Sequence, residues 1–436
     1  MFKTLSNALK VKEIRNGLLF TLFIMIVIRL GSLIPVPGLD TVRVSQYLQD
    51  TMGDNGFLNS ITGGSFSQMA IFALGVTPYI TSSIIIQLLT IAIPALEELS
   101  KDGEDGRKKL NTITRYTTIL LAIIEGIGLT IGFDRGGYLT VDGMLGYLLI
   151  VFTLTAGSTF VMWLGEKVTV YGVGNGISII LLINIVSRMP ADFYSLYVLF
   201  VKGKDLVQMI IAAAVIVLVV IATVVLVVLL QDGVRKIPVQ YAQKVQGRKM
   251  VGGQGSHIPL KVNTSGVIPI IFASSILSVP QIVMNLFGKQ PTGVWASIFN
   301  GMNQNYWFNP DHPWGSVGVI FYILLVLFFA YFYTSVTFNP MEIANNLKRG
   351  GGFIPGIRPG KPTQDYLNKI LNFIVFIGAL FLIIVALIPI FFSGMFNANV
   401  SFGGTSLIII VGVVVDTIKQ IESKMIVRNY SGFLND

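Results

Sequence analysis

The sequence predicts an all-α membrane protein: ten transmembrane helices in two inverted, pseudo-symmetric halves of five around a central pore. Three observations support this fold class, namely the composition, the long apolar runs and a motif that occurs twice. Of the 436 residues, 53% are hydrophobic and 12% are charged, and the mean hydropathy is +0.72. Soluble domains do not have such values, so the lipid bilayer is the main solvent of this chain.

Ten apolar runs have the length of a membrane span, because a helix crosses the roughly 30 Å acyl core with about 20 residues. The expected spans are 17–36, 68–95, 113–132, 147–165, 174–189, 207–230, 264–286, 316–338, 368–392 and 404–421. The run at 174–189 is short and the run at 68–95 is interrupted, which leaves the count open by one. The first run is too long for a signal peptide and ends in prolines, so we interpret it as a retained span.

The distribution of positive charge predicts the orientation, because short cytoplasmic loops carry an excess of lysine and arginine. With the N-terminus inside, 24 of the 31 lysines and arginines are cytoplasmic, 6 lie in outside loops and Arg29 lies in the first span. Both termini are therefore expected in the cytoplasm. The expected parts are an N-terminal segment (1–16), an N-terminal half (17–189), a C-terminal half (190–421) with cytoplasmic loops 231–262 and 339–367, and a tail (422–436).

Two features argue against catalysis and bound metals. Cysteine is absent, and the two histidines, His257 and His312, lie in predicted loops, so we expect no disulfide, no metal site and no cofactor. No nucleophile and base pair can be named, and the chain is not expected to be an enzyme. The segment from Gly356 to Thr363 lacks the glycine spacing of a phosphate-binding loop and has Pro362 after Lys361.

A motif in the second span returns in the seventh. Gly75–Ile85 (GVTPYITSSII) and Gly266–Ile276 (GVIPIIFASSI) agree at Gly, Val, Pro, Ile, Ser and Ile. Since each half has five spans, the two copies have opposite orientations in the membrane. Inverted repeats with glycine and proline at matching positions mark a pathway between the halves. A plain proline kink in a packing helix is the alternative interpretation of Pro78 or Pro269 alone.

The segment at 57–68 is too polar and too short to cross lipid, yet it leads directly into the second span. A re-entrant segment fits this pattern, and an ordinary outside loop is the alternative. The two basic loops, 231–262 and 339–367, favour a docking platform for a cytoplasmic partner, with ordinary positive-inside retention as the alternative.

The pathway itself is expected to be lined by aliphatic side chains. Within the spans, the ionisable candidates are few: Arg29, Glu125 and Asp416. A transporter of a small solute needs polar coordination at the midplane, whereas a ring of aliphatic side chains seals a pore by dewetting. A secondary transporter coupled to an ion gradient remains the alternative function.

Several segments together resemble the bacterial SecY family over the chain from the first span to the tenth. They are Leu74–Leu89, Tyr171–Leu181, Pro259–Asn263, Gly356–Gly360 and Phe402–Ser406. The resemblance implies the central subunit of the Sec translocase, a passive channel that conducts unfolded polypeptides across the bacterial cytoplasmic membrane and releases transmembrane segments laterally into lipid. The implied partners are the SecE and SecG subunits, the SecA motor ATPase, the ribosome, signal peptides, nascent chains and membrane lipids.

The resemblance also implies roles for individual residues. The pore ring falls on Val76, Ile80, Ile177, Leu181, Ile271 and Ile409. The plug falls on about 57–67, namely Phe57, Leu58, Asn59, Ser60, Ile61, Thr62, Gly63, Gly64 and Ser65. Lateral-gate residues are Thr81, Gln87, Glu125 and Asn263, and docking residues are Arg235, Lys236, Arg248, Lys249 and Arg358. Val76 and Leu181 replace the commoner isoleucine and keep an aliphatic ring.

Overall fold

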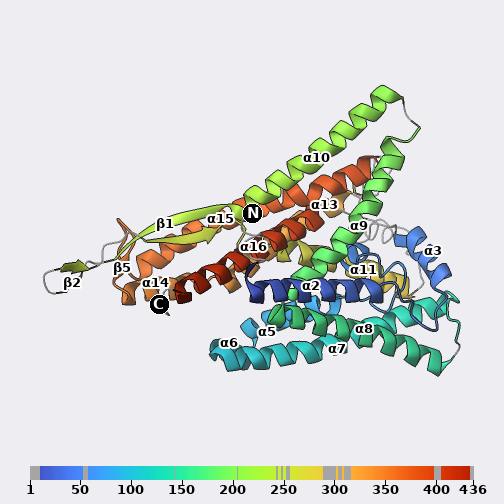
Figure 1. Cartoon of the computed structure of the whole chain (residues 1–436), viewed down its shortest axis with the longest axis horizontal. Coiled ribbons are helices and arrows are strands. Elements are labelled where there is room, and N and C mark those ends of the chain that lie inside the picture. Colours follow the sequence, from blue (N-terminus) through green and yellow to red (C-terminus); the bar gives the residue numbers. More distant parts are fainter. Residues whose placement is uncertain are drawn as a thin grey trace.

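The computed structural model describes residues 10–52, 57–141, 143–203, 205–241, 244–246, 249–251, 256–287, 301–302, 307–308, 316–396 and 404–432. A helix lies at each of the ten predicted apolar runs (Figure 1). These helices are α2 (Lys12–Gly31), α5 (Thr77–Ala92), α7 (Gly103–Arg135), α8 (Met144–Tyr171), α9 (Gly176–Phe200), α10 (Leu206–Asp232), α11 (Ile268–Phe287), α13 (Val317–Thr337), α15 (Lys361–Phe396) and α16 (Gly404–Gly432).

The apolar character of the described helices agrees with a membrane fold. Seven of them, α2, α7, α8, α9, α10, α13 and α15, are long and apolar enough to span a bilayer. An eighth candidate is α5 together with α6 (Pro94–Lys101), which are bent by 104° where Pro94 begins the second helix. Helices α11 and α16 complete the ten.

The two halves repeat the same helix packing. In the N-terminal half, α7 contacts α5 and α8, α8 contacts α2 and α9, and α2 contacts α9. Their counterparts five spans later repeat each pairing: α13 contacts α11 and α15, α15 contacts α10 and α16, and α10 contacts α16. The sequence repeat is therefore a structural repeat, and the odd number of helices per half inverts one copy relative to the other.

Contacts between the halves fall into two groups among the described residues. Helix α9 contacts α10 and α16, and α7 contacts α11. In the first group, Ile180 and Leu181 of α9 pack with Ile409 of α16 in one apolar cluster. The second group joins the third span to the seventh, whose α11 is the repeat counterpart of α5. We call the boundary between the two halves the seam.

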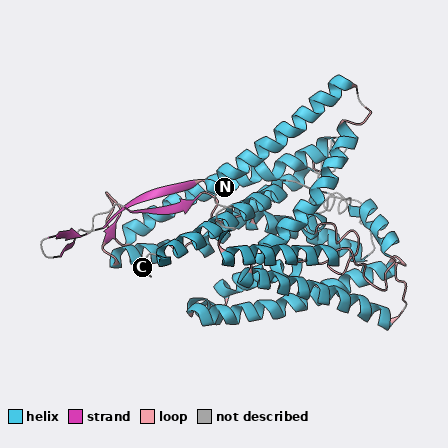
Figure 2. Cartoon of the chain, viewed as in Figure 1, coloured by secondary structure: helices cyan, strands magenta, loops and turns pink. Residues whose placement is uncertain are grey.

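A small β-sheet, which the sequence analysis did not predict, lies at one end of the helices (Figure 2). Strand β1 (Val234–Tyr241) pairs antiparallel with β4 (Ser256–Lys261) and with β5 (Gly352–Phe353), so the two long loops form one folded unit. Ile237 and Val239 alternate with exposed residues along β1 and are buried. At the tip, β2 (Lys244–Gln246) pairs with β3 (Lys249–Val251).

Several helices extend beyond the expected runs, and α9 and α16 have the longest extensions at their C-terminal ends. Helix α9 continues from 189 through Pro190 to Phe200, so the boundary placed at 189/190 falls inside a helix and Arg188 lies on α9 instead of in an outside loop. The end of this span was predicted too early from hydropathy, because the residues after Pro190 are a mixture of polar and apolar types. Helix α16 likewise continues to Gly432, past the expected start of the tail at 422.

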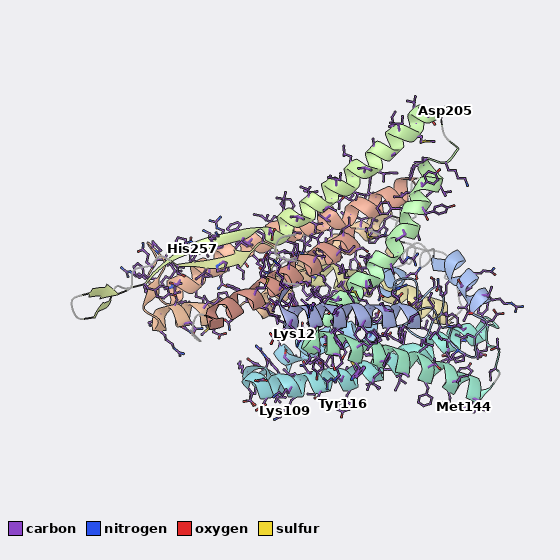
Figure 3. The ribbon with its side chains drawn as sticks, in the orientation of Figure 1. Lys12, Lys109, Tyr116, Met144, Asp205 and His257 are labelled. Atoms are coloured by element: carbon purple, nitrogen blue, oxygen red, sulfur yellow. The ribbon has the colours of Figure 1, made fainter. Side chains whose placement is uncertain are left out.

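The remaining short helices lie in the connections. They are α3 (Thr41–Met52), α4 (Phe57–Thr62) and α14 (Pro340–Arg349). Lys12, Lys109 and His257 lie toward the end that carries the sheet, and Met144 and Asp205 lie toward the opposite end (Figure 3). This separation matches the loop assignment from the distribution of positive charge.

Candidate pore between the two halves

The repeated motif has the same backbone geometry in both halves. Gly75 and Gly266 have φ angles of +53° and +64°, and the helices begin two residues later, at Thr77 and Ile268. Pro78 and Pro269 therefore lie in the first turn of their helices, where a missing N–H costs no helical hydrogen bond. A break or kink within the helix at Pro78 or Pro269 is therefore wrong, because the interruption is a turn before the helix.

Most of the predicted ring side chains meet in one apolar cluster. Val76, Leu181 and Ile409 are buried in it, and Ile80 and Ile177 pack against it half-buried. The amide of Ile80 donates to the carbonyl of Val76 at 3.0 Å, which confirms that these two residues are one helical turn apart.

Ile271, the sixth ring residue, is buried on α11 outside this cluster, and Val267, one turn before it, packs against the cluster. The cluster draws on α2, α5, α8, α9 and α16, and thus on both halves. A pathway along the seam is closed here by packed aliphatic groups.

The segment predicted as the plug is buried against this cluster. It contains α4, six residues long, followed by turns, and every described side chain from Asn59 to Ser67 is buried. Of Phe57 and Leu58 the structure describes the backbone only. Ile61 belongs to the same apolar cluster as Val76 and Leu181. Gly63 and Gly64 both adopt positive φ, at +67° and +88°, so glycine is required for this turn.

Many of the segment's polar groups are paired within the segment itself. The carboxamide oxygen of Asn59 accepts from the amide of Ser67 at 3.3 Å, and the amide of Gly64 donates to the carbonyl of Asn59 at 3.0 Å. The hydroxyl of Thr62 accepts from the amide of Phe66 at 3.3 Å. These bonds make the segment a compact unit that is not part of a sheet or a long helix.

Two side chains from distant helices hold the segment from outside, and the sequence analysis assigned a role to neither. Asn184 on α9 is 4% exposed, and its amide nitrogen donates to the carbonyl of Ile61 at 3.0 Å. Arg29 on α2 donates to the carbonyl of Gly63 and to the side-chain oxygen of Asn184, both at 3.4 Å. The available signal was one asparagine within the apolar sequence Leu181 to Ile185.

The predicted lateral-gate residues are not joined to one another by hydrogen bonds in the described part of the chain. Thr81 is half-buried and Gln87 is exposed, both on α5, and Glu125 is half-buried on α7. Asn263, just before α11, is 6% exposed, and neither its side-chain nitrogen nor its oxygen has a hydrogen-bond partner. A buried amide without partners costs about 1–3 kcal/mol, so Asn263 lowers the stability of this arrangement.

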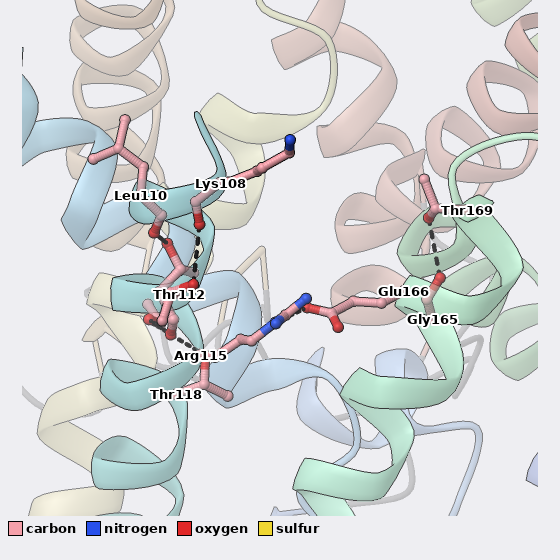
Figure 4. Close-up of polar contacts among 10 residues, drawn as sticks. Lys108, Leu110, Thr112, Arg115, Thr118, Gly165, Glu166 and Thr169 are labelled. Atoms are coloured by element: carbon pink, nitrogen blue, oxygen red, sulfur yellow. Dashed lines mark hydrogen bonds and ion pairs between the residues drawn. The ribbon is translucent and has the colours of Figure 1, made fainter. Parts of the chain in front are cut away.

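Polar contacts link α5, α7 and α8 within the N-terminal half. The hydroxyl of Ser82 on α5 donates to the carbonyl of Thr114 on α7 at 2.8 Å in a buried position. Arg115 on α7 pairs with Glu166 on α8 at 2.6 Å (Figure 4). Helices α5, α7 and α8 are thereby linked, while α7 meets α11 of the other half across the seam.

The predicted docking residues lie on and beside the small sheet. Arg235 and Lys236 are exposed on β1, and Arg358 is exposed in the turn before α15. The sheet rests on a core of its own, which contains Ile237, Leu260, Leu347, Ile354 and Leu367. Arg248 lies outside the described residues, and Lys249 is described only by its backbone on β3.

In the described part of the chain, no group of three or more histidine, aspartate or glutamate side chains could hold a metal ion. The seam has aliphatic packing, and the buried segment 57–67 contributes Ile61 to it. These features define a class: a pseudo-symmetric membrane protein with its pathway between two inverted halves.

Comparison with known proteins identifies the family. The SecY family model matches residues 70–418, and the chain belongs to the SecY family. Curated relatives named protein translocase subunit SecY are 46% identical in Bacillus licheniformis and 44% identical in both Bacillus subtilis and Halalkalibacterium halodurans. Each alignment covers 100% of both chains.

Solved structures share the fold at low sequence identity. One described as "The structure of a protein conducting channel" has a TM-score of 0.64 at 19% identity, covering 95% of this chain and 94% of the other. A second, "Sec61 in the Canine ribosome-channel complex from the endoplasmic reticulum", has a TM-score of 0.59 at 17% identity, covering 95% and 94%. The "idle yeast Ssh1 complex bound to the yeast 80S ribosome" has a TM-score of 0.60 at 16% identity, covering 95% and 89%.

Proposed function

We propose that this chain is the channel subunit of a protein translocase: it conducts unfolded polypeptides through the seam and releases transmembrane segments sideways into lipid. Membership of the SecY family and the aliphatic packing of Val76, Ile80, Ile177, Leu181 and Ile409 support this function. An aliphatic constriction grips a chain of any sequence without binding a particular solute. The energy comes from partners, and the chain itself catalyses no reaction.

In this proposal residues 57–67 form the plug of the resting channel. The segment is buried, packs Ile61 into the ring cluster and is not built into a sheet or long helix, which supports a part that can leave as a unit. The lateral gate opens between α5 and α7 on one side and α11 and α13 on the other. The unpartnered amide of Asn263 beside α11 supports this placement.

The sheet unit receives cytoplasmic partners. The exposed side chains of Arg235, Lys236 and Arg358, all at the end of the molecule that carries the sheet, support docking of the ribosome and of the SecA motor. Two relatives in fold are ribosome-bound complexes. The chain lies in the bacterial cytoplasmic membrane with both termini in the cytoplasm, and SecE and SecG bind it there. Signal peptides, nascent chains and lipids contact it at the lateral gate.

Ring substitutions test this function against the alternative of a small-solute transporter. We expect Ile80→Asn and Ile271→Asn to raise the resting ion conductance of the reconstituted complex, because a polar group favours water in the constriction. The matched variants Ile80→Leu and Ile271→Leu keep an aliphatic seal and the resting conductance of the parent. Unchanged conductance and unchanged protein export in both asparagine variants would exclude Ile80 and Ile271 as residues of the pore ring.

A further inference from the structure

Asn184 uses both ends of its side-chain amide at the junction of three distant segments. Its nitrogen donates to the carbonyl of Ile61 in the plug segment at 3.0 Å, and its oxygen accepts from Arg29 at 3.4 Å. Arg29 also donates to the carbonyl of Gly63 at 3.4 Å. Two side chains, from α2 and α9, thus bond two carbonyls at the end of α4, those of residues 61 and 63.

The close approach of the three segments depends on glycine at position 63. A Cβ there would lie 2.7 Å from a guanidinium nitrogen of Arg29 and 2.9 Å from the Cα and carbonyl oxygen of Asn184. Contacts this short do not occur between real atoms of these kinds, and Gly63 also has a φ of +67°. The plug backbone at Gly63 therefore lies directly against the side chain of Arg29 and the backbone of Asn184.

If residues 57–67 move as a unit, some hydrogen bonds of this region are kept and others are broken. The pairs within 57–67, such as Asn59 with Ser67, survive a rigid-body movement of the segment. Beyond the segment, the amide of Val36 donates to the carbonyl of Met69 and the amide of Ile71 donates to the carbonyl of Ile34, each at 2.9 Å, which fixes the chain after 68. Displacement of the segment breaks the bonds from the side chains of Arg29 and Asn184, and also bonds to the following residues, such as the one from the amide of Ala70 to the carbonyl of Ser65 at 3.0 Å.

We propose that Arg29 and Asn184 form a latch that holds the plug of this channel closed and thereby sets how often the plug opens at rest. The proposal rests on the proposed function of residues 57–67 as the plug. The latch is stable because a buried amide in an apolar helix is costly without partners, and the closed plug supplies carbonyl acceptors to both side chains. The nitrogen of Asn184 makes the shortest of the three bonds and is expected to contribute most.

Thiol labelling of the plug measures the latch directly, since the natural chain contains no cysteine. Ser60→Cys introduces a thiol at a plug position that is 8% exposed, and a polar maleimide reaches it only when the plug moves. In the full-length chain within membranes, we expect Asn184→Leu to raise the labelling rate about tenfold, the factor associated with one hydrogen bond. Arg29→Met should raise it by a smaller factor, because its bonds are longer.

Two controls separate a latch from general loosening of the helices. Ser195→Ala removes a hydroxyl that bonds only within the same helix α9, and it should leave the labelling rate at that of the parent. Ser82→Cys places a thiol at a position of 0% exposure on α5. If Asn184→Leu raises labelling of this second thiol as much as that of the plug thiol, the role of Asn184 is structural and the latch is overturned.

A plug deletion distinguishes failure of the latch from failure of the proposed function. Removing residues 57–65 should raise the resting ion conductance if the segment seals the pore. Unchanged labelling of the plug thiol in both Asn184→Leu and Arg29→Met overturns the latch, while increased conductance of the deletion variant would still support the plug. If the deletion also leaves the conductance unchanged, the plug function fails together with the latch.

Discussion

Gly75 and Gly266 occupy equivalent positions in the two halves, 191 residues apart, and both have a left-handed backbone, with φ angles of +53° and +64°. Each glycine lies two residues before a helix of the seam, Gly75 before α5 and Gly266 before α11. The left-handed turn lets an irregular segment enter the membrane region and then start a helix there. Such irregular backbone is tolerated at membrane depth when protein covers it.

Alanine at either glycine is expected to destabilise the protein. A residue with a side chain pays about 1–2 kcal/mol for a left-handed conformation. A Cβ at Gly75 would also lie 3.3 Å from the methyl group of Thr62, whereas a Cβ at Gly266 would have nothing within 4 Å. Thermal unfolding of the purified variants should therefore rank the parent above Gly266→Ala and Gly266→Ala above Gly75→Ala. A Gly266→Ala midpoint equal to that of the parent would contradict the strain argument.

Neighbouring glycines in the plug should respond differently to alanine. Gly63→Ala forces a Cβ against Arg29 and Asn184, while a Cβ at Gly64 has only a guanidinium nitrogen of Arg188, at 3.4 Å. Both positions have positive φ, so alanine causes backbone strain in either variant, and the two variants differ only in the steric clash of the added Cβ. Resting ion conductance should be higher in Gly63→Ala than in Gly64→Ala. Equal conductance in the two variants would show that contact with the helices does not hold the plug.

The Arg115–Glu166 pair should stabilise the protein only weakly. The side chains are 48% and 25% exposed, and exposed ion pairs contribute about 0.2–1 kcal/mol. A double-mutant cycle with Arg115→Gln and Glu166→Gln is expected to give a coupling free energy below about 1 kcal/mol, falling with added salt. A coupling well above this range would mean that the pair is shielded from water by a partner or by lipid.

Charge reversal on the sheet unit should impair partner-driven export. Arg358→Glu replaces an exposed cation beside the sheet with an anion, and we expect motor-driven export to fall at least tenfold while the protein remains in the membrane. Arg43→Glu is a matched control, because Arg43 is exposed on α3, at the opposite end of the molecule. Normal export by Arg358→Glu, or equal loss in both variants, would exclude the docking role.

The spans and the repeat could be predicted because their causes are local. Twenty apolar residues specify a span, and the Gly-Val-x-Pro pattern specifies the turn before α5 and α11 in both halves. Five of the six ring residues could likewise be brought together from that pattern and the family resemblance. The local pattern did not show that Pro78 and Pro269 lie in the first turn of their helices, because it does not indicate where the first hydrogen-bonded turn begins.

The sheet and the plug contacts escaped prediction because they join residues far apart in the chain. Strand β1 pairs with β5 about 110 residues later, by the count from Gln240 to Phe353, and no hydropathy signal marks that pairing. The bond between Arg29 and Asn184 joins residues 155 positions apart. Each polar residue was visible within its span, but only the fold shows that both bond plug carbonyls, Asn184 that of Ile61 and Arg29 that of Gly63.

The central claim, that polypeptides pass between the halves through the aliphatic ring, is tested most directly by crosslinking an arrested secretory chain. A photoreactive residue is placed at position 80 or 271, and at position 221 as a control, since Ile221 is 58% exposed on the outer face of α10. We predict crosslinks to the arrested chain from positions 80 and 271 and none from 221. Crosslinks from 221 alone, or equally from all three positions, would contradict a pathway through the seam.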